Sequence, residues 1–154
     1  MNLKTLIIAR HGDYDRSGNL SEYGKANMLK LGKKLFPLFE GVETVILTSP
    51  APRASQSAKI LGDLENIVPI VHSILWADDL HPRDLGAALH LIKKQTAETL
   101  IIVTHLEYAN EIPPEFAEKV LKTSARPFWH IIEKGEAVVI DCKKKKCAKI
   151  SYLG

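Results

Sequence analysis

Short apolar runs alternate along the chain with longer stretches whose apolar residues recur every three or four positions. Leu3–Ala9, Thr44–Thr48 and Thr99–Thr104 have the length and continuous apolar character of strands buried on both faces. A fourth run, Ile67–Val71, contains Pro69, which places that strand at the edge of a sheet. The alternation of strands with helical stretches predicts a layered α/β fold.

Four stretches have helical spacing. The first begins after Ser21, a favourable N-cap, and is expected to end or bend at Pro37. The second has Pro52 in its first turn, where a missing N–H is tolerated. The third carries the clearest apolar stripe, and the fourth is expected to open at Pro114 and run to about Lys122. The residues expected to face the core are Met28, Leu31 and Leu35; Ala54, Ala58 and Leu61; and Leu85, Ala88, Leu89 and Ile92.

The last part of the chain has the pattern of a β-hairpin. Glu136–Cys142 and Cys147–Tyr152 are the expected strands, and Lys143–Lys146 connect them. Four lysines indicate a solvated loop. Recruitment of an acidic partner or a membrane surface is the alternative, but four lysines fall short of a strongly basic segment. Cys142 and Cys147 are expected to be free, because two ligands are too few for a structural zinc site.

Composition is that of one globular domain over residues 1–154, with 45% apolar and 25% charged residues. The net charge of +3 favours anionic substrates but does not indicate nucleic acid. The first residues lack the features of a secretory signal, and no apolar stretch is as long as a membrane span. We therefore expect a cytoplasmic protein with reduced thiols and no membrane or nucleic-acid partner, and leave its oligomeric state open.

Cationic and imidazole side chains follow three of the predicted strands. Arg10 and His11 follow the first run, Arg53 follows Thr44–Thr48 after a short loop, and His105 follows the third run. If these strands are parallel neighbours, all four side chains meet where open α/β sheets bind ligands. Arginine binds phosphoryl groups through a two-pronged fork, so the sequence predicts a phosphate pocket at this edge. The alternative is a set of solvated surface side chains.

Within such a pocket, His11 is the candidate nucleophile. Histidine can form covalent intermediates, and two neighbouring arginines would depress its pKa and keep the ring neutral. His105 can donate a hydrogen bond to phosphoryl oxygens and stabilise charge in the transition state. The alternative for each is a structural histidine in a strand-to-loop turn.

A leaving alkoxide or amine also needs a proton donor. Asp78 and Asp79 precede the third helix, and either can act as the acid if burial and the phosphate raise its pKa. Asp13 and His81 are rival donors. Asp79 can equally begin or cap the helix before Leu85.

Four segments, in this order, resemble the motifs of one superfamily. Arg10–Gly12 is the Arg-His-Gly signature of the histidine phosphatases, which are also called phosphoglycerate-mutase-like. Leu20–Gly24 resembles their Leu-Thr-Glu-x-x-Gly helix start, with one residue fewer before the glycine. Ser49–Ala58 resembles Ser-Pro-x-x-Arg-Ala-x-Gln-Thr-Ala, and Val103–His105 resembles Val-x-His. The resemblance implies a three-layer α/β/α fold, with a mostly parallel sheet, helices on both faces and the C-terminal hairpin.

The resemblance also implies a mechanism that needs no metal or other cofactor. His11 would become phosphohistidine, while Arg10, Arg53 and His105 hold the phosphoryl oxygens and water later releases phosphate. A carboxylate between the second arginine and the second histidine would protonate the leaving group, and Asp79 is the residue that we assign, with Asp78 left open. The short chain resembles the phosphohistidine phosphatase branch, which implies a phosphorylated protein or a small phosphate ester as substrate.

The match departs from the family in three respects. The acid-bearing segment is not a clean match, the insertions that cover the site in sugar-phosphate mutases are missing, and the segment around the second histidine differs. Where the family has Gly-His-Asn-Pro, the chain has Thr104–Glu107, and Glu107 adds a negative charge near the pocket. A catalytically weak phosphoryl-binding module is therefore the second hypothesis. A mutase is the third hypothesis, and it would require a lid that protects the phosphoenzyme from water, which we do not expect so short a chain to build. A dinucleotide-binding fold is disfavoured, because no Gly-x-Gly-x-x-Gly follows the first strand.

Overall fold

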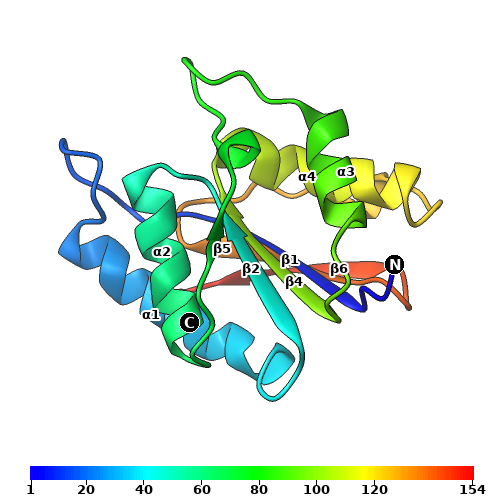
Figure 1. Cartoon of the computed structure of the whole chain (residues 1–154), viewed down its shortest axis with the longest axis horizontal. Helices are drawn as coiled ribbons and strands as arrows, with labels where there is room; N and C mark the ends of the chain where they lie inside the picture. Colours follow the sequence, from blue (N-terminus) through cyan, green and yellow to red (C-terminus); the bar gives the residue numbers. More distant parts are fainter.

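A six-stranded sheet forms the middle of the protein in the computed structural model, which describes all 154 residues (Figure 1). Its strand order is β3-β2-β4-β1-β5-β6. The first four strands in chain order are mutually parallel, and the last two form an antiparallel hairpin against β1. Their bounds are β1 Thr5–Arg10, β2 Thr44–Thr48, β3 Ile70–Val71, β4 Thr99–Thr104, β5 Glu136–Asp141 and β6 Lys146–Ser151.

Four helices cover the two faces of this sheet. The helix α1 (Glu22–Leu35) and the helix α2 (Pro52–Asp63) bury one face, together with alternate residues of the central strands. The helix α3 (Leu85–Lys93) and the helix α4 (Leu106–Lys119) bury the other. This is the three-layer α/β/α arrangement with a mostly parallel sheet and a C-terminal hairpin that the sequence and its resemblance predicted (Figure 1). Short 3₁₀ turns complete the chain at Phe36–Leu38, Ser73–Leu75 and Arg126–Phe128.

The central strands and first three helices follow the predicted pattern. All six residues of β4 are buried, because β1 and β2 flank it and helices cover both faces. Ser21 caps α1 by accepting a hydrogen bond from Gly24 N at 3.0 Å, and Pro37 lies in the turn that ends the helix. The first strand runs one residue further than predicted, so Arg10 is its last residue.

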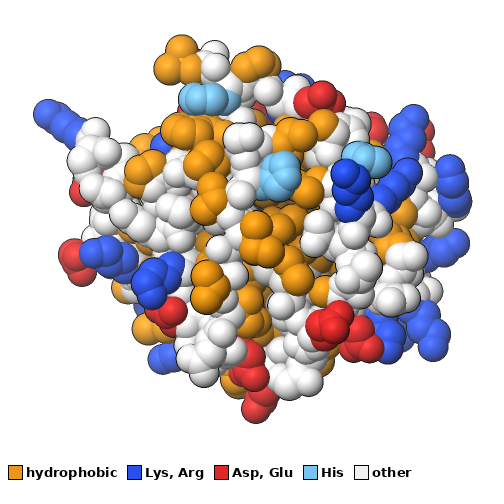
Figure 2. All heavy atoms as spheres, viewed as in Figure 1, with side chains coloured by type: hydrophobic (Ala, Val, Ile, Leu, Met, Phe, Trp, Pro, Cys, Tyr) orange, Lys and Arg blue, Asp and Glu red, His pale blue; other side chains and the backbone are white.

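The edge formed by β3 is short and exposed. Only Ile70–Val71 pairs with β2, rather than the whole run from Ile67, and Pro69 lies just outside the pairing. Val68, Ile70 and Val71 are exposed, and Figure 2 shows apolar side chains on the face where this edge runs. The edge position predicted from Pro69 is confirmed.

The predicted start of the fourth helix at Pro114 is wrong. The helix begins at Leu106, directly after β4, and continues through Pro113 and Pro114 to Lys119. Each proline removes a backbone hydrogen bond within the helix. Burial of the apolar face, which includes Tyr108, outweighs that loss, as tertiary packing commonly does in proteins.

Two smaller expectations also change. Asp84, not Asp79, caps α3, since its Oδ1 accepts a hydrogen bond from Ala87 N at 3.0 Å. In the hairpin, Lys146 belongs to β6, and the turn has Lys145 in a left-handed conformation with φ of 55°. Both cysteines are free. None of the helices combines the length and apolar character needed to cross a membrane.

Candidate phosphoryl-binding site

The predicted site residues meet at the carboxyl ends of β1, β2 and β4, the end of the sheet from which the loops 11–21 and 76–84 extend (Figure 1). The rings of His11 and His105 lie 5.1 Å apart, centroid to centroid, at an angle of 67°. Arg53 Nη2 is 3.5 Å from His105 Nδ1. Arg10 is the last residue of β1 and directly precedes His11, and its positive charge acts to lower the pKa of both histidines.

His11 is buried, with 3% of its surface exposed, and its tautomer follows from one contact. Nδ1 lies 2.9 Å from the carbonyl oxygen of Gly12. A carbonyl oxygen only accepts, so Nδ1 carries the proton and Nε2 keeps its lone pair. Burial lowers the pKa of His11 to about 3, and the positive charges of Arg53 and Arg10 act in the same direction. The ring is therefore neutral at neutral pH, the form that can attack phosphorus.

His105 is held from two sides at the N-terminus of α4. Nδ1 faces the guanidinium of Arg53 and accepts from it, so Nε2 carries the proton and donates to Ser49 Oγ at 2.8 Å. Burial, and then the charge of Arg53, lower the pKa of His105 to about 4. Like His11, it is a neutral ring among cations.

The two arginines have buried donors without protein partners. Arg53, 15% exposed, lies over the ring of Tyr14 at 4.8 Å and 3.7 Å from Asp78 Oδ2. Arg10 Nη1 donates to the carbonyl oxygen of Ile132 at 3.1 Å. The Nε atoms of both arginines are buried and make no hydrogen bond. Unpaired buried donors are costly, and a phosphoryl group supplies the acceptor oxygens that would satisfy them.

The two candidate acids differ in position. Asp78 reaches the site through its ion pair with Arg53, whereas Asp79 is exposed and makes no hydrogen bond or ion pair. Partial burial acts to raise the pKa of Asp78, but hydrogen bonds from His81, Leu80 and Trp76 outweigh it and lower the pKa to about 2. Asp78 is thus a carboxylate held by donors rather than a carboxylic acid ready to give up a proton.

Three residues that the sequence reasoning did not assign support the site. Ser49 Oγ accepts from His105, and Ser57 Oγ accepts from Gly12 N at 3.0 Å. Tyr14 packs edge-on against His11 at 5.4 Å. Both serines lie in the Ser49–Ala58 motif, so the motif itself was the signal.

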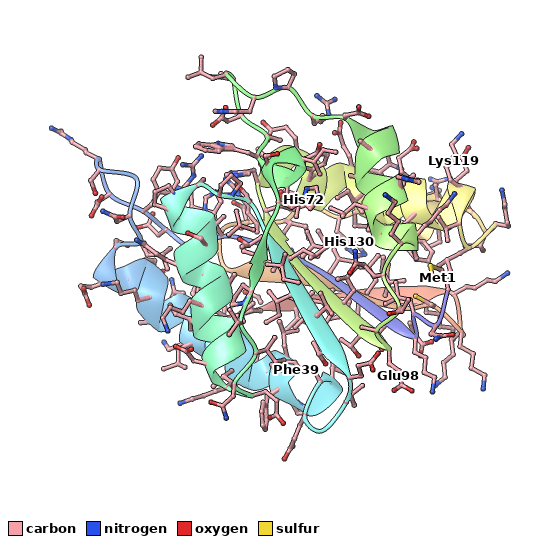
Figure 3. All side chains as sticks on the ribbon, viewed as in Figure 1. Met1, Phe39, His72, Glu98, Lys119 and His130 are labelled. Atoms are coloured by element: carbon pink, nitrogen blue, oxygen red, sulfur yellow. The ribbon has the colours of Figure 1, made fainter.

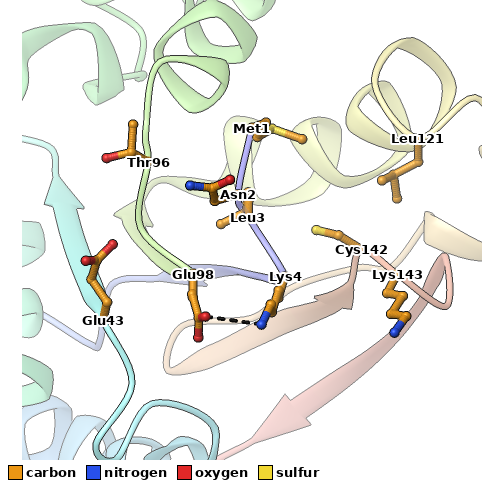
Figure 4. A pocket seen from close by; sticks show the side chains of 10 residues that line it. All are labelled: Met1, Asn2, Leu3, Lys4, Glu43, Thr96, Glu98, Leu121, Cys142 and Lys143. Carbon is orange, nitrogen blue, oxygen red and sulfur yellow. Dashed lines mark hydrogen bonds and ion pairs between the residues drawn. The ribbon is translucent and has the colours of Figure 1, made fainter.

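The opposite end of the sheet offers a different kind of cavity. A surface cavity of about 710 Å³ is lined by residues that precede β1, β2 and β4 (Figure 4). Met1 and Glu98, labelled in Figure 3, lie at this end, and Glu98 pairs there with Lys4 at 3.1 Å. Cys142, the one thiol that lines this cavity, has a pKa raised to about 11 by burial. Nowhere do three or more His, Cys, Asp or Glu side chains converge to hold a metal ion.

Comparisons with known proteins bear on the fold of the chain. No family model and no curated protein matches the chain. Solved structures do: the protein histidine phosphatase SixA complexed with tungstate superposes with a TM-score of 0.71 at 18% identity, over 96% of this chain and 97% of that one. The putative phosphohistidine phosphatase SixA from Agrobacterium tumefaciens gives 0.63 at 19% identity, over 90% and 92%.

A more distant enzyme shares the same architecture. Phosphoglycerate mutase from Plasmodium falciparum superposes with a TM-score of 0.60 at 17% identity, over 96% of this chain and 88% of that one. The predicted resemblance thus extends to the whole fold as well as the motifs. The chain has the fold of the histidine phosphatases, the phosphoglycerate mutase-like fold.

Proposed function

We propose that this chain is a phosphatase whose nucleophile is His11. The observation that carries the proposal is the state of that ring: buried, neutral, with its Nδ1 proton held by Gly12 O and its Nε2 lone pair left over. Beside it lie Arg53 and His105, and the buried Nε donors of Arg10 and Arg53 have no partner. A nucleophile among unpaired cationic donors is suited to a phosphoryl dianion.

The reaction has two steps. His11 Nε2 uses its lone pair to form a bond to phosphorus, and the bond from phosphorus to the leaving oxygen or nitrogen breaks, its electron pair staying on the leaving group. Arg10 and Arg53 hold the phosphoryl oxygens meanwhile, and His105 can join them as a donor when the bound anion brings a proton to its Nδ1. Water then attacks phosphorus, the nitrogen–phosphorus bond breaks, and its electron pair returns to His11 Nε2. The side chains that we assign carry out both steps, and the proposed mechanism does not use a metal ion.

We propose a phosphorylated protein or a small phosphate ester as the substrate, acted on in the cytoplasm by residues 1–154 as one domain. Two of the similar structures are named as histidine or phosphohistidine phosphatases, which supports a phosphorylated side chain. Tyr14, at the rim of the site, is 39% exposed and lies over both His11 and Arg53. Arg53 and Lys134 both lie over the Tyr14 ring, so the exposed edge of Tyr14 is the part that can contact whatever carries the phosphate.

The test is hydrolysis of p-nitrophenyl phosphate in excess EDTA, with rapid acid-free quenching to trap labelled enzyme. We expect turnover by the wild type and a phosphoenzyme that is stable in base but labile in acid, as phosphoramidates are. His11→Gln should abolish both. His90→Gln, an exposed histidine on α3, is the matched control and should retain both. Turnover that survives in the His11 variant would falsify the proposal.

A phosphoryl-binding module with little turnover is the second candidate. It is favoured by two negative charges beside the arginines: Asp78, 3.7 Å from Arg53, and Glu107, whose charge acts on Arg10. Calorimetry with vanadate, beside the turnover assay, separates the two functions. Binding by the wild type without phosphoenzyme formation would favour the module.

A further inference from the structure

His81 is fixed beside the site by contacts with two neighbours, Asp78 and Trp76. Its Nδ1 lies 2.8 Å from Asp78 Oδ1, and its backbone N–H donates to the same oxygen at 3.0 Å. The backbones of Asp78 and His81 also exchange two hydrogen bonds, at 3.0 and 3.2 Å. The ring stacks on Trp76 at 4.1 Å with an angle of 15°. Ring position and tilt are therefore both set.

The contact with Asp78 also settles which ring nitrogen is available. A carboxylate with a pKa of about 2 is an acceptor at neutral pH, so Nδ1 of His81 donates to it. Nε2 has no protein partner among the hydrogen bonds of the structure, and the side chain is 41% exposed. A carboxylate that holds one nitrogen of a histidine in place while the other exchanges a proton is the arrangement of general acid–base catalysis.

The same carboxylate connects His81 to the phosphoryl site. Asp78 accepts from His81 through Oδ1, while its Oδ2 accepts from Trp76 Nε1 at 2.7 Å and lies 3.7 Å from Arg53 Nη2. Arg53 in turn faces His105. The charge of His81 is among the causes, after burial, that lower the pKa of His105, so the two rings lie in one electrostatic neighbourhood.

The carboxylates near the site are less suited to give a proton. Asp79 is exposed, and its carboxylate makes no hydrogen bond or ion pair that would hold it at the site. Asp13 accepts from Ser21 Oγ at 2.7 Å and pairs with Lys134 at 3.7 Å, so both its oxygens are engaged. Asp78 itself is ionised and bound by donors on both oxygens.

We infer that His81 is the proton donor to the leaving group, and that Asp78 is the positioning residue that holds it. The inference rests on the proposed function, since it assigns a role within that reaction. It replaces Asp79 in the role first assigned from the sequence.

The protons balance over the two steps. When His11 Nε2 bonds to phosphorus, the leaving oxygen keeps the electron pair of the broken bond and takes the proton from His81 Nε2, which becomes neutral. When water attacks the phosphohistidine, His81 Nε2 accepts one proton from that water as the new oxygen–phosphorus bond forms. The products are an alcohol and phosphate, and His81 ends protonated as it began.

The experiment compares esters whose leaving groups differ in need of a proton. His81→Asn is the chosen variant, because its amide nitrogen can keep the bond to Asp78 while Nε2 is removed. With p-nitrophenyl phosphate, whose leaving group departs unprotonated, we expect a change of no more than a few-fold. With phenyl phosphate or an alkyl phosphate we expect a loss of roughly 100-fold or more in kcat/KM. His90→Asn is the matched control.

A pH profile gives a readout that a merely structural role would not move. The charged groups around His81 are Asp78 on its own loop, Arg53 on α2 and His105 at the start of α4; Arg83 nearby is paired with Glu111. Wild-type activity on phenyl phosphate should fall at alkaline pH, where the leaving oxygen lacks a proton donor. That fall should be absent in His81→Asn. Free imidazole should restore His81→Ala on phenyl phosphate only.

The outcomes distinguish this inference from the proposed function. Equal loss on all esters, or no loss on any, would overturn the role of His81 while leaving His11 as nucleophile. A selective loss in Asp79→Asn or Glu107→Gln, with His81→Asn unaffected, would move the role to that carboxylate. A wild type without turnover on any ester would overturn the proposed function, and this role with it.

Discussion

The guanidinium of Arg53 and the imidazole of His105 face each other directly, with Nη2 of the first 3.5 Å from Nδ1 of the second. The contact joins the first turn of α2 to the end of β4, although 52 positions separate the residues in the chain. In the proposed reaction both groups bind the same tetrahedral anion, Arg53 as a permanent cation and His105 as a ring that can gain a proton. Because of this contact, one substitution at Arg53 should change both phosphate binding and the pKa of His105, and both can be measured.

Replacing Arg53 by Gln should weaken both phosphate binding and the suppression of charge on His105. We expect kcat/KM for p-nitrophenyl phosphate to fall about 10²–10³-fold, the loss typical of removing one transition-state donor. After burial, the Arg53 charge is the main cause that lowers the pKa of His105, so that pKa should rise from about 4. NMR titration of the histidine rings checks this. Arg126→Gln, exposed and remote, should change neither quantity, and an unmoved pKa in Arg53→Gln would refute the coupling.

Acid should destabilise the protein in a window set by its two buried histidines. The pKa of His11 is about 3 and that of His105 about 4 in the folded state, against 6.5 for an ordinary histidine. As pH falls below about 6.5 the unfolded chain binds protons that the folded chain does not, so the free energy of unfolding falls until about pH 3. Asp78, with its pKa lowered from 3.8 to about 2, adds a loss in the same direction as pH falls from 3.8 to about 2.

Chemical denaturation at a series of pH values measures this dependence. The His11→Gln variant should show a flatter decline between pH 6.5 and 3, by an amount on the order of a few kcal/mol over the window. His90→Gln, which replaces an exposed histidine, should decline as steeply as the wild type. Equal slopes in the wild type and His11→Gln would mean that His11 binds its proton as readily in the folded protein as in the unfolded chain.

The elements that were predicted best are those whose local signal and tertiary role agree. The bounds of β2 and β4 match the prediction at both ends, because each apolar run is bounded by residues that leave the sheet. The start of α4 was missed because Pro114 is a local signal for a first turn, whereas burial of Tyr108 and its neighbours against the sheet draws the helix back to Leu106. At this helix the free energy gained by packing against the sheet outweighs the low helix propensity of the two prolines.

The site was predictable up to the choice between adjacent residues. Motif order brought His11, Arg53 and His105 together before any coordinates, and their contacts agree with that grouping. Which of Asp78 and Asp79 faces the pocket depends on the backbone exchange between positions 78 and 81, a turn that no periodicity reports. The hydrogen bond by which Asp78 holds His81 depends on the same turn, so it could not be predicted from the sequence either.

Ser57 connects Gly12, in the loop that follows β1, to α2, the helix that carries Arg53. Its Oγ accepts from Gly12 N at 3.0 Å and donates to Arg53 O at 2.7 Å. Ser57→Ala would leave the buried N–H of Gly12 without an acceptor, which typically costs about 1–3 kcal/mol. Because that N–H follows His11 in the chain, we also expect slower phosphoenzyme formation. Thermal unfolding and burst kinetics measure the two effects. Ser55→Ala, at a less buried serine of the same helix, should change neither; matching values for both variants would rule out the bridge.

Gly12 and Gly24 lie against each other where the loop that follows β1 passes the first turn of α1. A Cβ added at Gly24 would lie 2.1 Å from the carbonyl oxygen of Asp13, and one added at Gly12 would lie 2.9 Å from the carbonyl oxygen of Gly24. These neighbours are backbone atoms and cannot rotate away. This close approach explains why the helix-start segment Leu20–Gly24 ends in glycine, although that glycine comes one residue earlier than in the family motif.

Gly24→Ala should therefore push the loop after His11 away from α1. Alanine favours a helix by about 1 kcal/mol over glycine, so without the clash the change would stabilise the protein. Contact with the backbone of Asp13 should reverse the sign and give a net loss of about 1–3 kcal/mol, as overpacking does. Displacement of the loop should also lower kcat with p-nitrophenyl phosphate. Gly86→Ala in α3, whose added Cβ would meet only Asp84 Oδ1 at 3.5 Å, is the control and should be neutral or stabilising. Denaturation and turnover of the two variants side by side decide the matter: a Gly24→Ala protein as stable and active as Gly86→Ala would mean that the loop does not depend on this contact.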